Sequence, residues 1–403
     1  MKSRIYFPGL DGIRFLAAMF VVIGHTEQFK TIMGIINTYD ESFFLNRITL
    51  SANDAVLMFF VLSGFLITYL LLVEIERTDN VSIRDFYIRR TLRIWPLYYL
   101  LVLVGFFLVP IIIKLTGFDG YYQSISKDFV PKFALYLTFL PNVATIFAFM
   151  PVGISHLWTI GVEEYFYLLW PQLIKRFRKN ILPAIIAVML IRLLIMITVY
   201  FRFTIRGYSP LRPGGFDLVI LALNKFPFEA MAIGGLAAYI YYHQKESILR
   251  VLYHPIMMYS ILGLLAVNMV VHSSMLAPYT LFFSTFLINT FYAILILNIA
   301  TNPRFPLKLE NPFFRRMGKL SYGIYMYHLV VIYFTMIAFD KFNYRRDDLL
   351  YNLLLYTIVF SVTLALAHFS YKYFEKPFLR LKERFAVVKS GHAVETETTG
   401  SPG

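Results

Sequence analysis

The sequence predicts an all-α, polytopic integral membrane protein, a bundle of about ten transmembrane helices with both termini in the cytoplasm. Three observations predict this fold class. Of the 403 residues, 58% are hydrophobic and only 15% are charged, whereas about 25% are charged in an ordinary soluble domain. The mean hydropathy is +0.62. The apolar residues also gather in windows of about 20, the length that crosses a hydrocarbon core. A soluble globular protein and a disordered chain are both excluded.

Eight windows are apolar enough to be predicted as spans on their own. Two further regions are less apolar. Region 13–34 carries Arg14, His25 and Glu27; because no small-residue cleavage site follows its apolar run, we interpret it as a helix and not as a signal peptide. Region 132–170 is interrupted by Pro141 and Pro151. The eight clear windows are 53–73, 95–113, 180–200, 218–241, 251–271, 281–299, 324–339 and 349–371.

The basic residues decide the number of crossings. The formal net charge is +14, which in a membrane protein indicates cytoplasmic loops rich in Lys and Arg and contact with anionic membrane lipid, not nucleic acid. If region 132–170 crosses once, most Lys and Arg lie inside; two crossings would place the basic loop 304–319 outside. We therefore expect ten spans in a transmembrane domain over 1–384, followed by a disordered polar tail over 385–403.

The residue types also limit the chemistry. The chain has no cysteine, which excludes a thiolate metal site and a cysteine nucleophile. No histidine pair has a spacing such as H-E-x-x-H, so no metal is expected. Catalytic or transport chemistry must therefore come from polar residues within the bundle.

Two ionisable residues share one face of the first predicted helix. Arg14 and His25 are eleven residues apart, which is about 20° beyond three full turns and about 16 Å along the axis. Ionisable residues within spans usually face the bundle interior. The alternative is an arginine that extends to the cytoplasmic headgroups and a histidine near the outer interface.

The second predicted helix starts with Asp54 at the level of His25. Its carboxylate could orient the imidazole and fix the tautomer, or it could cap its own helix. Ser63 and Gly64 lie near mid-membrane, where small residues usually allow close helix packing, with a lining role also open to Ser63.

A pair of arginines precedes the third span. Arg90 and Arg93 are neighbours at i and i+3 on a helix, and their guanidinium groups suit a phosphate or pyrophosphate better than lysine does. Juxtamembrane arginines also serve as cytoplasmic anchors. The specific hypothesis is a phosphate-bearing donor bound on the cytoplasmic side.

The broken region contains the run SHLWTIGVEEYFYLLWP. His156 and Glu163 are seven residues apart and share a face if the run is helical. A carboxylate that precedes an apolar run is not an anchor pattern, so Glu163 is a candidate site residue. We also expect Ser63, His156, Trp158 and His328 to line the substrate path.

Six segments, in order, resemble acyltransferase family 3, the polytopic O-acyltransferases of the bacterial inner membrane that modify cell-envelope glycans. The resemblance covers almost the whole chain. The segments are LDGIRFLAAMFVVIGH (10–25), FFVLSGFLIT (59–68), RRTLRIWPLYY (89–99), HLWTIGVEEYFYLLWP (156–171), GKLSYGIYMYHLVV (318–331) and FEKPF (374–378).

The resemblance implies roles for particular residues. It makes His25 and Arg14 an essential pair, Arg90 and Arg93 the cytoplasmic arginine pair, and Glu163 the acid of the fourth segment. It implies acyl-CoA as donor, with acetyl the expected group, and a carbohydrate or lipid-linked glycan as acceptor. Some relatives carry a fused periplasmic esterase-like domain, and we expect the form without it.

These implications lead to a mechanistic hypothesis. His25 acts as general base on the acceptor hydroxyl or as a transient acyl carrier, and Asp54 or Glu163 orients it. A transporter or flippase that uses the same Arg, His and Glu residues as a relay is the alternative, although the sequence shows no repeat of one half in the other.

Overall fold

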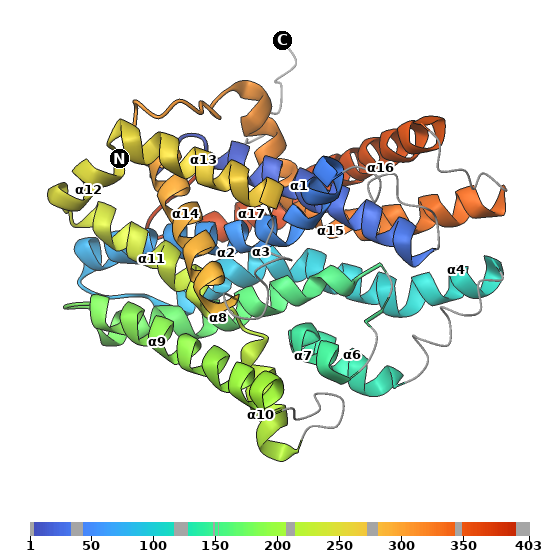
Figure 1. The fold of residues 1–403 in the computed structure, drawn as a ribbon, viewed down its shortest axis with the longest axis horizontal. Helices are drawn as coiled ribbons and strands as arrows, with labels where there is room; N and C mark the ends of the chain where they lie inside the picture. The colour runs from blue at the N-terminus through green and yellow to red at the C-terminus, as the bar shows by residue number, and fades with distance from the viewer. Residues whose placement is uncertain are drawn as a thin grey trace, which may run out of the picture.

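In the computed structural model the chain is helical throughout its described part, and the one strand-like contact there is an isolated parallel bridge between Ile5 and Ser390. Figure 1 shows the arrangement of the helices. The structure describes residues 4–33, 43–116, 128–147, 150–151, 153–206, 214–271, 281–342 and 349–391.

The helices follow one another with short connections. Three π-helical segments and one 3-10 turn interrupt or extend them. In chain order the elements are α1 (Leu10–Ile32), α2 (Phe43–Thr78), α3 (Ile83–Leu103), η1 (Val104–Leu108), α4 (Val109–Thr116), α6 (Phe129–Leu137), α7 (Pro141–Phe147), η2 (Ser155–Leu157), α8 (Trp158–Arg176), α9 (Leu182–Val199), η3 (Tyr200–Ile205), α10 (Gly215–Asn224), α11 (Phe228–Tyr242), α12 (Glu246–Leu252), α13 (Pro255–Val271), α14 (Leu281–Thr301), α15 (Pro312–Lys341), α16 (Leu349–Phe369), η4 (Ser370–Glu375) and α17 (Lys376–Glu383).

Helix α2 is the centre of the bundle and packs against α1, α8, α11, α13 and α14. Its contact with α11 is backbone to backbone. A Cβ atom on Gly64 would lie 1.9 Å from the carbonyl oxygen of Met231, and one on Gly234 would lie 2.0 Å from that of Val61. Small residues are what allow helices to approach this closely in a membrane, so the packing interpretation of Gly64 is confirmed.

Six helical segments of the described chain are long and apolar enough to cross a membrane, or seven if the pair α12 and α13, bent by 55°, forms one span. The expectation of about ten spans is therefore met in part. Helices α1 and α8 carry charged residues within their length, and α11 has only 15 residues. The six segments are Ala52–Thr78, Ile83–Leu115, Leu182–Ile205, Ser284–Thr301, Pro312–Lys341 and Leu349–Glu383.

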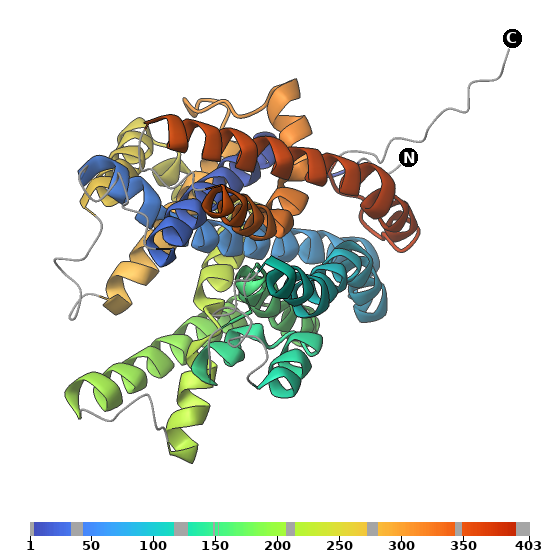
Figure 2. The ribbon, with the colours of Figure 1, turned by 90° about the vertical axis from the view of Figure 1, so that its right-hand side faces the viewer.

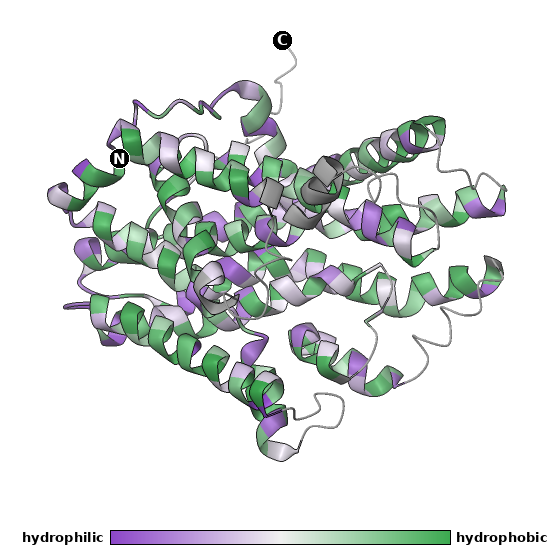
Figure 3. Ribbon diagram, viewed as in Figure 1, coloured by the Kyte–Doolittle hydropathy of each residue, from purple (hydrophilic) through white to green (hydrophobic). Residues whose placement is uncertain are grey.

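The outer surface of the bundle is apolar. Large side chains on α9 face outward, among them Leu190 at 59% and Leu194 at 65% exposure, and Leu353 on α16 is 61% exposed. Figure 3 shows hydrophobic residues over most of α9. Helices α9 and α10 lie along one edge of the bundle, away from α15 and α16, in both views (Figures 1 and 2). A surface of this kind is stable against lipid, and the chain is a multi-pass membrane protein.

Two predicted spans are broken in the structure. The window 218–241 is divided between α10 and α11, because Pro227 lacks the backbone N–H that would continue the helix. In region 132–170, α6 and α7 have 9 and 7 residues, which gives lengths of about 14 and 10 Å, too short to cross. Helix α8, with 19 residues, is the one described element in that region with the length of a span, and it is not among the six apolar segments.

Candidate functional site

A cavity of about 300 Å³ lies where α1, α2, α3, α8 and α15 meet. Its wall includes Arg14, Ser63, Arg90, Arg93 and Glu163, which the sequence analysis singled out on four separate helices. A Cβ on Gly318 of α15 would lie 2.4 Å from the Cβ of Asp11, so the glycine allows α15 to close against the start of α1. The closure of helices far apart in sequence thus creates one polar chamber.

The carboxylate of Glu163 belongs to a compact polar cluster. Its Oε2 accepts a hydrogen bond of 2.8 Å from the hydroxyl of Tyr167, and its Oε1 accepts one of 3.2 Å from Ser63 Oγ. The two hydroxyls lie 2.9 Å apart. The guanidinium of Arg90 stacks 5.1 Å from the centre of the Tyr167 ring and 5.4 Å from that of Phe86. Cation–π contacts of this kind hold an arginine in place without neutralising it.

The cavity has an excess of positive charge. Arg14 pairs with Asp11 at 3.1 Å. Within the described part of the chain, by contrast, no carboxylate lies within ion-pair distance of Arg90 or Arg93. Guanidinium groups that lack a protein carboxylate are suited to bind an anionic ligand.

Tyr6, which precedes α1, also lines the cavity. Its hydroxyl donates to Glu310 at 2.7 Å. Burial, and then this hydrogen bond, raise the pKa of Tyr6 above its usual value. Tyr6 therefore stays a neutral donor that holds the Glu310 carboxylate.

His25 does not line this cavity and instead pairs with a second histidine. Its Nδ1 lies 2.8 Å from Nε2 of His328, and the rings are stacked. His328 Nδ1 lies 2.6 Å from the carbonyl oxygen of Tyr325. Because a carbonyl can only accept, His328 Nδ1 carries the proton and its Nε2 accepts from His25 Nδ1 in the neutral pair. His25 Nε2 is then left with a free lone pair, the arrangement that a general base needs.

The two expectations for Asp54 are wrong. Its Oδ2 accepts a hydrogen bond of 2.8 Å from Asn268, while His25 is oriented by His328. Helix α2 begins at Phe43, so Asp54 lies inside the helix and does not cap it. Glu163 hydrogen-bonds Ser63 and Tyr167 and does not orient the imidazole either.

Three of the four predicted lining residues lie outside the cavity wall; the fourth, Ser63, lines it. His156 packs edge-on against His328, with ring centres 4.8 Å apart, and Trp158 packs edge-on against Phe60. His156 belongs to a 3-10 turn that precedes α8, so it does not continue the helical face of Glu163. His156 and His328 thus lie with His25 and not with Glu163.

Tyr325 connects the cavity to the pair formed by His25 and His328. Its ring lines the cavity and its hydroxyl lies 2.7 Å from Thr159 Oγ1, while its backbone carbonyl holds His328. Sequence reasoning missed Tyr325, together with Tyr167, Glu375 and Lys382, all of which line the cavity. Tyrosines are common in this chain, with 29 in total, and no spacing rule separates those at the site from the rest.

Comparison with known proteins identifies the family. A family model described as an acyltransferase domain, acyltransferase family 3, matches residues 7–371. The chain is 28% identical over 403 residues to the O-acetyltransferase OatA of Staphylococcus aureus, and the match covers 94% of this chain and 58% of that protein. It is 25% identical over 396 residues to a putative O-acetyltransferase of S. aureus strain COL, with the same coverage. The chain thus spans 58% of the length of the curated relatives it matches. No solved structure matches. Because the family model covers most of the chain, including most of the cavity wall and the histidine pair, this protein belongs to acyltransferase family 3.

Proposed function

We propose that the protein is an O-acyltransferase of the bacterial inner membrane. It transfers an acyl group, with acetyl expected, from cytoplasmic acyl-CoA to a hydroxyl of a cell-envelope carbohydrate or lipid-linked glycan. One observation carries this proposal. The protein has a cavity lined by arginines and, apart from it, a histidine pair in which Nε2 of His25 can accept a proton. Its relatives are named O-acetyltransferases, which supports the choice of acetyl.

The proposed topology has ten spans and both termini inside. Helices α1, α8 and α11 join the seven apolar segments. Asp11 and Arg14 of α1 and Glu163 of α8 lower the apolarity of their helices and line the cavity. In this orientation Arg14, Arg90 and Arg93 lie near the cytoplasmic ends of α1 and α3. His25 lies in the outer half of α1. The donor and acceptor sites then belong to opposite halves of the membrane.

The donor is expected in the cavity. Arg90 and Arg93 would bind the phosphates of acyl-CoA, and the paired Arg14 extends the polar wall along α1. The acyl end then lies toward Tyr325 and Thr159. His25 and Arg14 do not share a cavity in this conformation, so transfer requires side chains at Tyr325 to move.

The chemistry at His25 follows from its tautomer. Nε2 takes the proton of the acceptor hydroxyl, the hydroxyl oxygen forms a bond to the thioester carbonyl carbon, and the carbon–sulfur bond breaks. The departing CoA thiolate takes the proton back from the imidazolium. Alternatively, Nε2 attacks the thioester itself and carries the acyl group to the acceptor. A burst of CoA release before acceptor is added would indicate this second route.

The first test replaces His25 by Ala in the full-length protein. We expect acceptor-dependent CoA release, and acetyl incorporation into envelope glycan, to fall by roughly 100-fold or more, the size of a general-base contribution. His243→Ala is the matched control, because His243 is exposed, lies outside the cavity wall and packs against Tyr239 and Tyr242. Retained transfer by a folded His25→Ala protein would remove His25 from the mechanism. If the wild-type protein accumulated glycan across the membrane and released no CoA, the result would instead support a transporter.

A further inference from the structure

We propose that the C-terminal helix α17 supplies a third cation, Lys382, to the donor-phosphate site. This inference rests on the proposed function and extends it to a part of the chain that the family match, which ends at residue 371, does not cover. The ligand chemistry is a thioester donor with more than one phosphate group, as in CoA. The inference stands on the position of Lys382, on its lack of a carboxylate partner and on the contacts that hold α17 in place.

Lys382 lies with the two candidate phosphate-binding arginines. Lys382, Arg90 and Arg93 together line both the main cavity and a smaller adjoining cavity of about 60 Å³. Helix α17 packs directly against α3, which carries the arginines, and the positive charges of Arg93 and Arg90 act on the Lys382 ammonium. Three like charges brought together repel one another, which favours a bound polyanion between them.

The protein itself does not neutralise this cluster. No carboxylate of the described residues lies within ion-pair distance of Lys382. The neighbouring carboxylate of Glu383 is engaged by Arg4 at 3.1 Å. Lys382 is also only partly exposed, although a lysine on a short terminal helix could extend fully into water. Its position against the arginines therefore indicates a ligand and not simple solvation.

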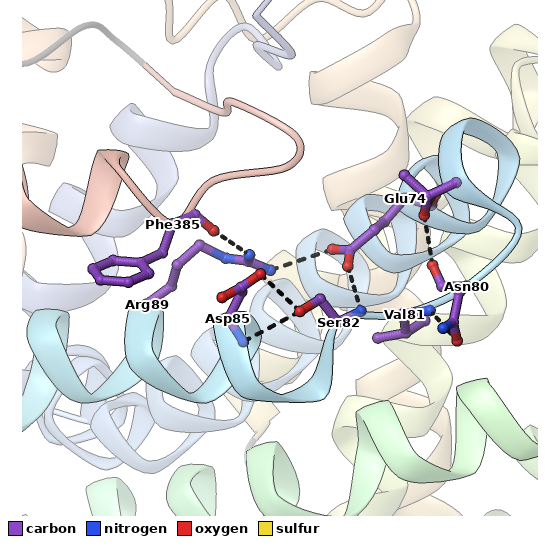
Figure 4. A network of polar contacts seen from close by, with 8 residues as sticks. Glu74, Asn80, Val81, Ser82, Asp85, Arg89 and Phe385 are labelled. Carbon is purple, nitrogen blue, oxygen red and sulfur yellow. Dashed lines mark hydrogen bonds and ion pairs between the residues drawn. The ribbon is translucent and has the colours of Figure 1, made fainter.

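Three linked contacts attach the segment that carries Lys382 to α3 and α2. Arg89 on α3 donates to the carbonyl oxygen of Phe385 at 2.7 Å and pairs with Glu74 on α2 at 3.3 Å (Figure 4). Glu74 in turn accepts from the backbone N–H of Ser82 at 2.8 Å, which fixes the corner between α2 and α3 (Figure 4). The chain after α17 is thereby attached to the helix that carries the arginine pair.

The N-terminal segment forms the other contacts. Ile5 donates its N–H to Lys389 at 2.8 Å and accepts from the N–H of Gly391 at 2.9 Å, which is the isolated parallel bridge of the fold. Ser390 and Gly391 line the cavity with Lys382. Ala386, Val388 and Lys389 line the smaller adjoining cavity. The segment 386–391 thus contributes to the walls beside the proposed phosphate site, although the sequence led us to expect a disordered tail there. Residues 392–403 lie outside the described part.

The experiment compares donors with and without phosphate. Lys382→Ala is assayed with acetyl-CoA and with acetyl-pantetheine, a thioester that has no phosphate. We expect the KM for acetyl-CoA to rise about tenfold, the usual effect of losing one charge-assisted hydrogen bond, and no such difference from wild type with acetyl-pantetheine. Lys382→Arg, which keeps the charge, is expected to restore most of the affinity. Arg384→Ala is the control, because Arg384 is an exposed cation just after the same helix that lines neither cavity.

A binding measurement separates this inference from the proposed function. Titration of CoA into purified wild-type and Lys382→Ala protein gives the dissociation constants without any turnover. Equal affinities of the two proteins for CoA, or an equal rise of KM with both donors, would overturn the role of Lys382 while leaving the proposed function in place. Wild-type protein that binds no CoA would overturn the proposed function, and this inference with it.

Discussion

A neutral histidine has one protonated and one unprotonated nitrogen, and in this protein a backbone carbonyl determines which is which. Tyr325 accepts from His328 Nδ1, His328 Nε2 then accepts from His25 Nδ1, and the lone pair of His25 is left on Nε2. No described carboxylate lies within ion-pair distance of His25. His328 is therefore a positioning residue, and its role is to fix the tautomer and the ring plane of His25.

This role predicts an order among substitutions of His328. Glutamine can place its amide oxygen near the position of the imidazole Nε2 and accept from His25 Nδ1, whereas alanine cannot. We expect His328→Ala to lower kcat by roughly 100-fold and His328→Gln to keep most of the activity. Rates of CoA release, together with unfolding temperatures in detergent, would show this order. Equal losses in the two variants at equal stability would contradict the tautomer argument.

At the scale of elements, the contact between α2 and α11 holds the site together. Ser63 of the polar cluster is next to Gly64, and Gly64 lies against the backbone of α11. The side of α2 that faces Glu163 is thus fixed in place by the close approach of a neighbouring helix. Helix α11 is held in turn by Glu229, which pairs with Arg192 of α9 at 2.7 Å in the buried interior. Ionisable residues within a membrane bundle are commonly paired in this way.

The close approach of α2 and α11 predicts that one added methyl group lowers stability strongly. In Gly234→Ala the new Cβ would collide with the carbonyl oxygen of Val61, and overpacking of this kind costs about 1–3 kcal/mol of stability. We expect a lower unfolding temperature and weaker transfer. Gly263→Ala on α13 meets no atom within 4 Å, so it should leave both unchanged or slightly raise stability. The two thermal unfolding curves provide the check, and an unchanged Gly234→Ala protein would show that α2 and α11 are less closely packed.

At the scale of the whole molecule, the helices divide into an apolar exterior and a polar interior. Exposed leucines cover α9 and α16, while Arg14, Glu163 and their partners face inward. Helices α1 and α15 supply residues to both the cavity and the histidine pair, and α8 supplies Glu163 and Tyr167 to the cavity, so the site depends on helices from the beginning, middle and end of the chain.

The proposed topology can be tested by labelling single introduced cysteines. The chain contains none, so a single introduced cysteine is the only target of a membrane-impermeant maleimide. We expect Lys341→Cys, at the exposed end of α15, to react in intact cells, and Lys245→Cys, exposed between α11 and α12, to react only after permeabilisation. Labelling of both positions from the same side would contradict the ten-span arrangement.

The sequence by itself determined the membrane class, most of the long helices and five polar residues of the cavity wall. The length of an apolar window predicts a span, and ionisable residues within a predicted membrane helix are so costly that their presence marks Arg14 and Glu163. Arg90 was selected by its i, i+3 spacing to Arg93. Local spacing also fixed which residues share a helix face. These are properties of one helix at a time, and they require no knowledge of its neighbours.

The tertiary structure alone decided which helices meet. His25 bonds His328, which is 303 residues away, in place of Asp54, and Lys382 reaches the arginines because the C-terminal segment is attached to α3 and to the N-terminus. Helical periodicity determines the direction in which a side chain points but not what lies opposite. That depends on how closely the backbones can approach, and in this protein Gly64, Gly234 and Gly318 set those distances.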